Sequence, residues 1–222
     1  MNPEKIAYWF FRLNGCATIT NFLVHPDQGG SQRTDVDVLA VRFPYRAELW
    51  TSGDPMEDHP VFKSDGKIDI IFAEVKHGPC RLNGPWTNPE DENMQRVLYA
   101  VGVFDSHQAP EVAQGLYQQG VYKNDIYRVR LFAVGERIND AILPPAVQLT
   151  WDEILTFIFD RFTTYQAQKA HHSQWDSTGS QLYDLASSHT QEDFVSTVKA
   201  RMQDHVDTRQ IARLNPRQRN HD

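Results

Sequence analysis

The chain has 222 residues, 40% of them hydrophobic and 23% charged, which is typical of a globular protein long enough to bury a sizeable core. Its net charge of -7 argues against a protein that coats nucleic acid by bulk positive charge. No apolar run approaches the roughly 20 residues of a membrane span, and the first residues lack the order of a secretory signal. Cys16 and Cys80 show no paired spacing, so neither a disulfide framework nor a structural zinc site is expected. We therefore expect a cytoplasmic protein that does not enter a membrane.

Helix and strand patterns alternate through the first part of the chain. The NPE at 2–4 supplies an N-cap, a first-turn proline and an acid near the positive end of the helix dipole, and predicts a helix that ends at the NG of 14–15. The polar stretch 44–67 is expected to be a long loop or an insertion. β-branched and aromatic runs predict strands at 18–25, 35–43, 68–77 and 126–134. Caps and helical spacing predict helices over 89–104 and 109–119.

From residue 150 onward the pattern indicates helices without strands. The segments 151–170 and 190–205 are amphipathic. The apolar stripe of the first segment can pack on the core or on a partner, and we interpret Trp151 as helix core rather than as a base-stacking platform. The stripe comprises Ile154, Phe157, Ile158 and Phe162.

The order of these elements predicts the α/β class, with one mixed central sheet flanked by helices. We expect this core to span 1–148. A helical extension over 149–205 would pack on the core or on a partner, and a basic, flexible tail would follow over 206–222.

Charged residues stand out on two of the predicted strands. Side chains alternate along a strand, so Glu74 and Lys76 share one face of 68–77, and Asp35 and Asp37 share one face of 35–43. If the strands are neighbours, Asp37 and Glu74 converge beside Lys76. Two such carboxylates repel unless a divalent cation neutralises them, and Mg²⁺ prefers carboxylate and phosphate oxygens. A lysine alongside could orient or deprotonate an attacking water, which together predicts metal-assisted phosphodiester hydrolysis.

This pattern resembles the PD-(D/E)xK, or restriction-endonuclease-like, nuclease superfamily. The matching residues are Asp37 in TDVDVLAV and the EVK at 74–76 in IDIIFAEVK. Gln95 and Tyr99 reproduce the QxxxY spacing of the RecB-like branch, and at four residues apart they share a helix face. The resemblance covers about residues 1–134 and implies a restriction-endonuclease-like core with an α-helical C-terminal extension.

The resemblance also implies roles for these residues. Asp37, Glu74 and the carbonyl of Val75 would hold Mg²⁺, for which Mn²⁺ would substitute, and Lys76 would position the water. Gln95 and Tyr99 would support Lys76 or contact the substrate backbone. The implied activity is cleavage of nucleic acid, DNA ahead of RNA, as the effector of a restriction, repair or anti-phage defence complex.

Each assignment has a structural alternative. The three charged residues could form a salt-bridge network on a solvated sheet face, and the QxxxY residues could be ordinary helix surface. Glu4 matches the superfamily's first-helix glutamate but also suits the helix dipole. Asp69 is out of phase with Glu74, and we expect it to face the other side of the sheet.

The competing class is a non-catalytic scaffold or interaction subunit that keeps the nuclease fold. A chain this acidic, whose cations gather only at 199–219, should bind DNA weakly by itself. We therefore expect a homo-oligomer or a subunit of a larger complex.

Overall fold

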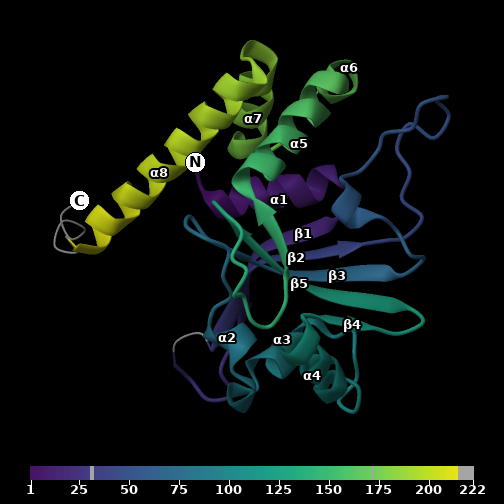
Figure 1. The fold of residues 1–222 in the computed structure, drawn as a ribbon, viewed down its shortest axis with the longest axis vertical. Coiled ribbons are helices and arrows are strands. Elements are labelled where there is room, and N and C mark those ends of the chain that lie inside the picture. The colour runs from purple at the N-terminus through teal and green to yellow at the C-terminus, as the bar shows by residue number, and fades with distance from the viewer. Residues whose placement is uncertain (31–32, 172, 215–222) are drawn as a thin grey trace.

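The computed structural model describes residues 1–30, 33–171 and 173–214, with only the backbone described over 206–214. Its centre is a six-stranded mixed sheet in the order β1-β2-β3-β5-β4, with β6 pairing on β5 (Figure 1). β1 pairs antiparallel with β2, β2 with β3 and β4 with β5, whereas β3 and β6 run parallel to β5. The strands are β1 (Ala17–Val24), β2 (Thr34–Arg42), β3 (Ile68–Val75), β4 (Val121–Lys123), β5 (Tyr127–Gly135) and β6 (Val147–Thr150).

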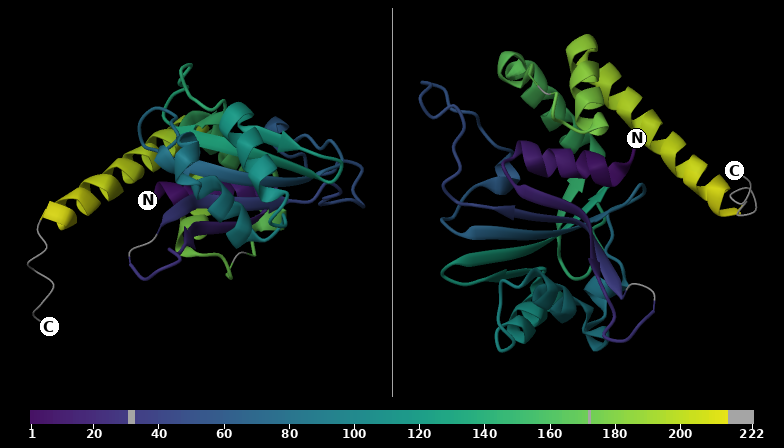
Figure 2. Two further views of the ribbon diagram at one scale, coloured as in Figure 1. Left: turned by 90° about the horizontal axis from the view of Figure 1, so that it is seen from below. Right: turned by 180° about the vertical axis from the view of Figure 1, so that it is seen from behind.

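Helices cover both faces of the sheet, which confirms the expected α/β class with a mixed, helix-flanked sheet (Figures 1 and 2). The helices are α1 (Pro3–Leu13), α2 (Gly84–Thr87), α3 (Asn93–Val101), α4 (Ala109–Gln119), α5 (Trp151–Thr164), α6 (Gln166–Lys169), α7 (Ser177–Ser188) and α8 (Gln191–Leu214). Two 3-10 turns, η1 (Pro60–Phe62) and η2 (Pro89–Asp91), complete the described elements. In the described part of the chain, none of these helices has the length and apolarity needed to cross a membrane.

Two hydrophobic clusters lie on opposite faces of the sheet. One cluster joins α1, α5, α7 and α8 to residues such as Val38 and Ala73, and the other joins α2, α3 and α4 to residues such as Leu39 and Phe72. Neighbouring strand residues thus belong to different clusters, as side-chain alternation requires.

The first helix forms as its sequence predicts. The Asn2 side chain accepts a hydrogen bond from the Glu4 amide at 2.9 Å, and the helix ends before Gly15, whose φ of 76° is a left-handed conformation that suits glycine. The predicted strands are present with ends shifted by one or two residues, and α4 spans the predicted range.

The helix predicted over 89–104 is shorter, and its start was wrong. Asn88 caps the separate turn η2, accepting a hydrogen bond from the Glu90 amide at 3.2 Å. Glu92 then takes a left-handed φ of 53°, which a continuous right-handed helix does not allow, so α3 begins only at Asn93.

The loop between β2 and β3 is long, as expected, and is pinned to the core by a buried charge network. Asp58 accepts hydrogen bonds from Arg42 and Arg46, each at 2.7 Å, and Arg161 of α5 lies 3.3 Å from the same carboxylate. This segment is therefore an ordered insertion fastened at its middle.

The helical C-terminal third shares its core with the sheet. Ile154, Ile158 and Phe162 of the predicted stripe are buried with α1, Phe157 packs against the same cluster, and Trp151 is also buried there. α7 was not predicted, and α8 continues past the expected end near 206 and projects beyond the sheet (Figure 2). The rest of the predicted tail, 215–222, lies outside the described residues.

Candidate active site

The register of β2 and β3 brings Asp37 and Glu74 together. Val38 lies opposite Ala73 in this antiparallel pair, so the next position outward sets Asp37 opposite Glu74. Residues directly opposite each other point to the same face. The Val75 amide donates to the Asp37 carboxylate at 2.8 Å, so a side chain takes over where backbone pairing between the two strands ends.

One ammonium group lies between these two carboxylates. Lys76 Nζ donates to Glu74 Oε1 and lies 3.9 Å from Asp37 Oδ2. The Glu74 side chain is 3% exposed, whereas those of Asp37 and Lys76 are each 16% exposed. The cluster is therefore mostly buried, open to solvent on one side, and carries one more negative than positive formal charge.

Two residues that the sequence interpretation missed hold the Glu74 carboxylate. Trp86 Nε1 donates to Oε2 at 2.7 Å, and Asn83 Nδ2 donates to Oε1. The Trp86 ring also stacks on Phe72, with centroids 5.9 Å apart and planes at 17°. One sequence feature could have pointed to Trp86: a tryptophan in an otherwise polar turn, directly after a buried strand with an acid near its end. The indole N–H can only donate a hydrogen bond, so it needs an acceptor such as that acid.

The backbone at Lys76 is fixed from two sides. Its amide donates to the Val134 carbonyl of β5 at 2.8 Å, and its carbonyl accepts from Trp151 Nε1 of α5 at 3.0 Å. The lysine therefore leaves the end of β3 in a defined direction.

Burial and the neighbouring negative charge change the proton affinity of one carboxylate. Burial, followed by the charge of Glu74, raises the pKa of Asp37 to about 7, against the opposing effects of the Val75 amide and Lys76. Glu4 makes a smaller contribution in the same direction as Glu74, which places its charge within electrostatic reach of the site. A positive charge supplied from outside would relieve this repulsion.

The donor chemistry fits a hard divalent cation. The carboxylates of Asp37 and Glu74 and the backbone carbonyl of Val75 offer only oxygen, which Mg²⁺ prefers together with water and phosphate oxygens. Over 1–30, 33–171 and 173–205, no group of three or more His, Cys, Asp or Glu side chains is arranged to hold a metal ion. Any cation here would thus depend on carbonyl, water or substrate ligands.

Gln95 and Tyr99 make no hydrogen bond to Lys76 in the described part of the chain. Gln95 lines a cavity of about 480 Å³ between α3 and α4, and Tyr99 is 45% exposed on α3. Within the described residues, neither donates to or accepts from the charged cluster. Support of Lys76 is therefore not seen in this structure, and contact with a substrate stays a prediction.

Asp69 lies in a different environment, as its phase predicts. It is 1% exposed and accepts hydrogen bonds from Arg128 at 2.8 Å and from Arg130 at 3.0 Å. It takes no part in the cluster around Lys76. Asp35 is half-buried on β2, opposite Leu23 of β1.

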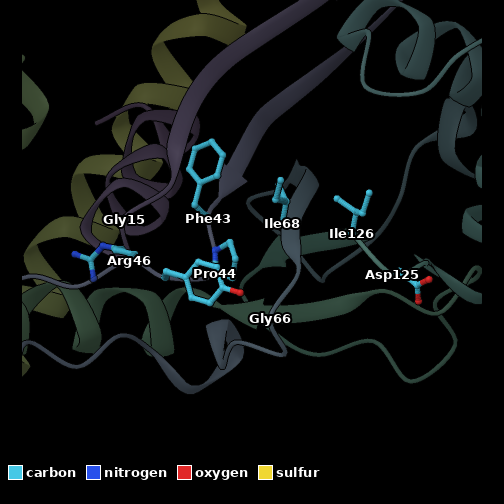
Figure 3. A pocket seen from close by; sticks show the side chains of 9 residues that line it. Gly15, Phe43, Pro44, Arg46, Gly66, Ile68, Asp125 and Ile126 are labelled. Atoms are coloured by element: carbon cyan, nitrogen blue, oxygen red, sulfur yellow. The ribbon is translucent and has the colours of Figure 1, made fainter.

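A larger cavity lies away from the charged cluster. It has a volume of about 670 Å³ and opens near the end of β2 and the start of β3, the ends opposite to Asp37 and Glu74 (Figure 3). Its lining includes Phe43, Ile68 and Ile126, so it is mainly apolar and lacks the paired carboxylates of the candidate site.

Comparisons with models of protein families, with curated proteins and with solved structures each found no match. The resemblance to the PD-(D/E)xK superfamily therefore rests on the residues quoted above.

Proposed function

We propose that this protein is a metal-dependent nuclease that uses Mg²⁺ to hydrolyse phosphodiester bonds, with DNA as the first substrate to test. The proposal rests on one observation. Two mostly buried carboxylates, Asp37 and Glu74, share the ammonium group of Lys76 where β2 and β3 stop pairing. A cluster built only for stability would balance its charges, whereas this one keeps a surplus negative charge beside solvent.

Asp37, Glu74 and the Val75 carbonyl would hold the cation. When bound, it would supply positive charge to the phosphate oxygens, which become more negative as the phosphate is attacked. Trp86 and Asn83 keep the Glu74 carboxylate in place, so little reorganisation of that ligand would be needed.

Lys76 would orient the attacking water and stabilise the phosphate by charge. The water oxygen forms the new bond to phosphorus and loses a proton. The bond from phosphorus to the leaving sugar oxygen breaks, and that oxygen takes up a proton. Since the backbone of Lys76 is fixed by β5 and α5, its side chain would reach the reacting groups from a constant origin.

The partners are also part of this proposal. A role as effector of a restriction, repair or anti-phage defence complex follows from the resemblance. Lys199, at the start of the basic segment, is paired with Glu136 at 2.8 Å and Asp152 at 3.0 Å, so in this structure its charge is neutralised within the chain. The need for a second chain to present DNA thus stays a prediction, which light scattering of the purified protein would test.

Cleavage of supercoiled plasmid with Mg²⁺, Mn²⁺ or EDTA tests the activity. Glu74→Gln keeps the shape of the side chain and its hydrogen bond to Trp86 but removes the charge. We expect nicking by this variant to be slower by roughly 10–100-fold or more, since loss of a group that only supports a metal ligand already costs 10–100-fold. Glu192→Gln, an exposed acid on α8, is the matched control and should cut normally.

Equal nicking by Glu74→Gln and the wild type would refute the site assignment. Failure of the wild type to cut plasmid, single-stranded DNA or RNA with either metal, together with no metal binding, would favour the scaffold alternative.

A further inference from the structure

A small cavity lined by two arginines lies near the candidate active site. It measures about 220 Å³ and is bounded by Pro26, Asp27 and Gln28 of the loop after β1, by Arg33, and by Arg96 of α3. None of these residues belongs to the cluster around Lys76, and the sequence interpretation gave them no role.

The sheet topology places this cavity at the same end as the carboxylates. The Arg33 amide donates to the carbonyl of Val24, the last residue of β1, at 3.0 Å. β2 begins at the next residue, Thr34, and Asp37 is its fourth residue. At about 3.3 Å per strand residue, the Cα atoms of Arg33 and Asp37 lie roughly 13 Å apart.

The cavity also lies on the same face as Glu74. Arg33 reaches over to α3, where Nε donates to Asn93 Oδ1 at 2.9 Å and a terminal nitrogen donates to the Asp91 carbonyl at 2.9 Å. α3 covers the sheet face that includes Phe72, and Trp86 of α2 packs on the same face and holds Glu74 there. The two arginines and the carboxylate cluster therefore border one continuous end of the molecule.

The charges inside the cavity suit an anion. Arg96 donates to Asp27 at 2.5 Å, its side chain is 30% exposed, and its Nε is buried with no hydrogen-bond partner among the described residues. Asp27 itself is 76% exposed and comes from a loop, so another anion can replace it at small cost. Arg96 thus faces one loosely held carboxylate, and Arg33 lines the same cavity while its guanidinium binds Asn93 and Asp91.

We propose that Arg33 and Arg96 form a phosphate clamp for the DNA strand that is cut, and that the Asp27 carboxylate occupies the clamp in the free protein. The carboxylate oxygens of Asp27 stand where phosphate oxygens would bind. The inference rests on the proposed nuclease function, since it assigns the clamp a DNA phosphate a few nucleotides from the scissile one. Phosphate contacts fix the position of a strand without reading its sequence, which suits a chain with no base-reading module.

Opposite effects of two substitutions test the clamp. Binding of a fluorescent DNA is measured by anisotropy in EDTA, so that no cleavage occurs, over about 50–200 mM salt, a range in which phosphate contacts change affinity strongly. Arg96→Gln should weaken binding about tenfold and lower the salt slope by about 1, as expected for one lost phosphate contact. Asp27→Asn should instead tighten binding, because it removes the competing anion. Arg12→Gln, an exposed arginine at the end of α1 on the other face, is the control and should bind as the wild type does.

The steady-state kinetics separate this proposal from the proposed activity. Arg96→Gln should raise KM and leave kcat nearly unchanged, because the clamp contacts no reacting atom. A wild type that binds DNA with the expected variant effects but never cuts would overturn the nuclease proposal and keep the clamp. Cleavage by the wild type with unchanged KM and affinity in both Arg96→Gln and Asp27→Asn would overturn the clamp and keep the nuclease.

Discussion

Two acids near opposite ends of β3 have different charge environments. Asp69 lies near the start of the strand and is enclosed by two guanidinium groups, Arg128 and Arg130. Glu74 lies at the other end and shares the single ammonium of Lys76 with Asp37. In the first cluster Arg128 and Arg130 are matched by Asp69 and by Asp65, whose carboxylate lies 3.3 Å from Arg128, so the charges balance. The second cluster has surplus negative charge around one ammonium.

The difference teaches how to tell a structural cluster from a candidate functional one. Asp69 has its hydrogen-bonding capacity filled by paired arginine donors, so nothing more needs to bind. The Asp37 and Glu74 pair, together with Lys76, is balanced only if a proton or a cation joins it, and burial together with the charge of Glu74 raises the pKa of Asp37. Buried charged residues alone therefore do not mark a candidate functional site. A buried cluster with unequal positive and negative charge that opens to solvent does.

The largest expected effect is on cleavage and concerns Lys76 in the candidate active site. Lys76→Ala removes the ammonium that the two carboxylates share, and cleavage should fall by about 10²–10⁴-fold, the range for loss of a positioned catalytic group. Plasmid nicking under Mg²⁺ measures it. Lys123→Ala, an exposed lysine on β4, is the matched control. Cleavage by Lys76→Ala within threefold of the control would remove Lys76 from the mechanism.

A substitution in the Asp69 cluster should instead lower the stability of the protein. Asp69→Ala leaves the buried Arg130 guanidinium without a carboxylate and Arg128 with only the partly exposed Asp65, and such a loss typically costs about 3–5 kcal/mol. Urea unfolding measures it, with Asp140→Ala, an exposed acid, as the control. A loss below about 1 kcal/mol, the level of a surface ion pair, would mean that Asp65 and the backbone carbonyls are enough to hold the two arginines without Asp69.

In metal-free solution, removing the Asp37 carboxylate should instead raise the free energy of unfolding. Its folded pKa of about 7 lies above the ordinary value of 3.8, so the folded protein holds a proton that the unfolded chain releases. The group's contribution to stability therefore falls as pH rises from about 4 to 7 and stays low above that. Asp37→Asn should be more stable than the wild type by roughly 2 kcal/mol at pH 8, allowing for partial exposure, and by less at pH 5.

Urea unfolding in EDTA at both pH values checks this sign. Mg²⁺ provides the complementary measurement, since it should raise the melting temperature of the wild type and not that of Asp37→Asn. A variant less stable than the wild type at pH 8, or an equal response of both proteins to Mg²⁺, would contradict the charge surplus.

Local sequence patterns predicted the convergence of Asp37, Glu74 and Lys76 because alternation along a strand has a fixed period. Once two strands are neighbours, the alternation of side chains along each strand decides which acids share a face. By the same rule Asp69 lies on the other face of the sheet. The cap at Asn2 is equally local, since its donor and acceptor lie two residues apart. These features needed no knowledge of distant contacts.

The remaining features depend on contacts between distant parts of the chain. β4 and β6 are too short for alternation to mark them, and they exist because β5 offers them an edge. Gln95 and Tyr99 share a helix face by spacing, but spacing does not say where α3 points that face. Likewise, the turn that carries Asn83 and Trp86 reads as polar loop until its position over β3 is known.

The smallest expected effect tests how far Glu74 depends on that turn. Trp86→Phe keeps an aromatic ring to stack on Phe72 and removes only the N–H that binds Oε2. Because Lys76 and Asn83 still hold the other oxygen, we expect a stability loss of about 1 kcal/mol and cleavage slower by less than tenfold. Trp50→Phe, at an exposed position, is the control for both urea unfolding and plasmid nicking. If Trp86→Phe abolished cleavage while folding normally, the orientation of the Glu74 carboxylate would matter as much as its charge, and charge surplus alone would no longer separate the two ends of β3.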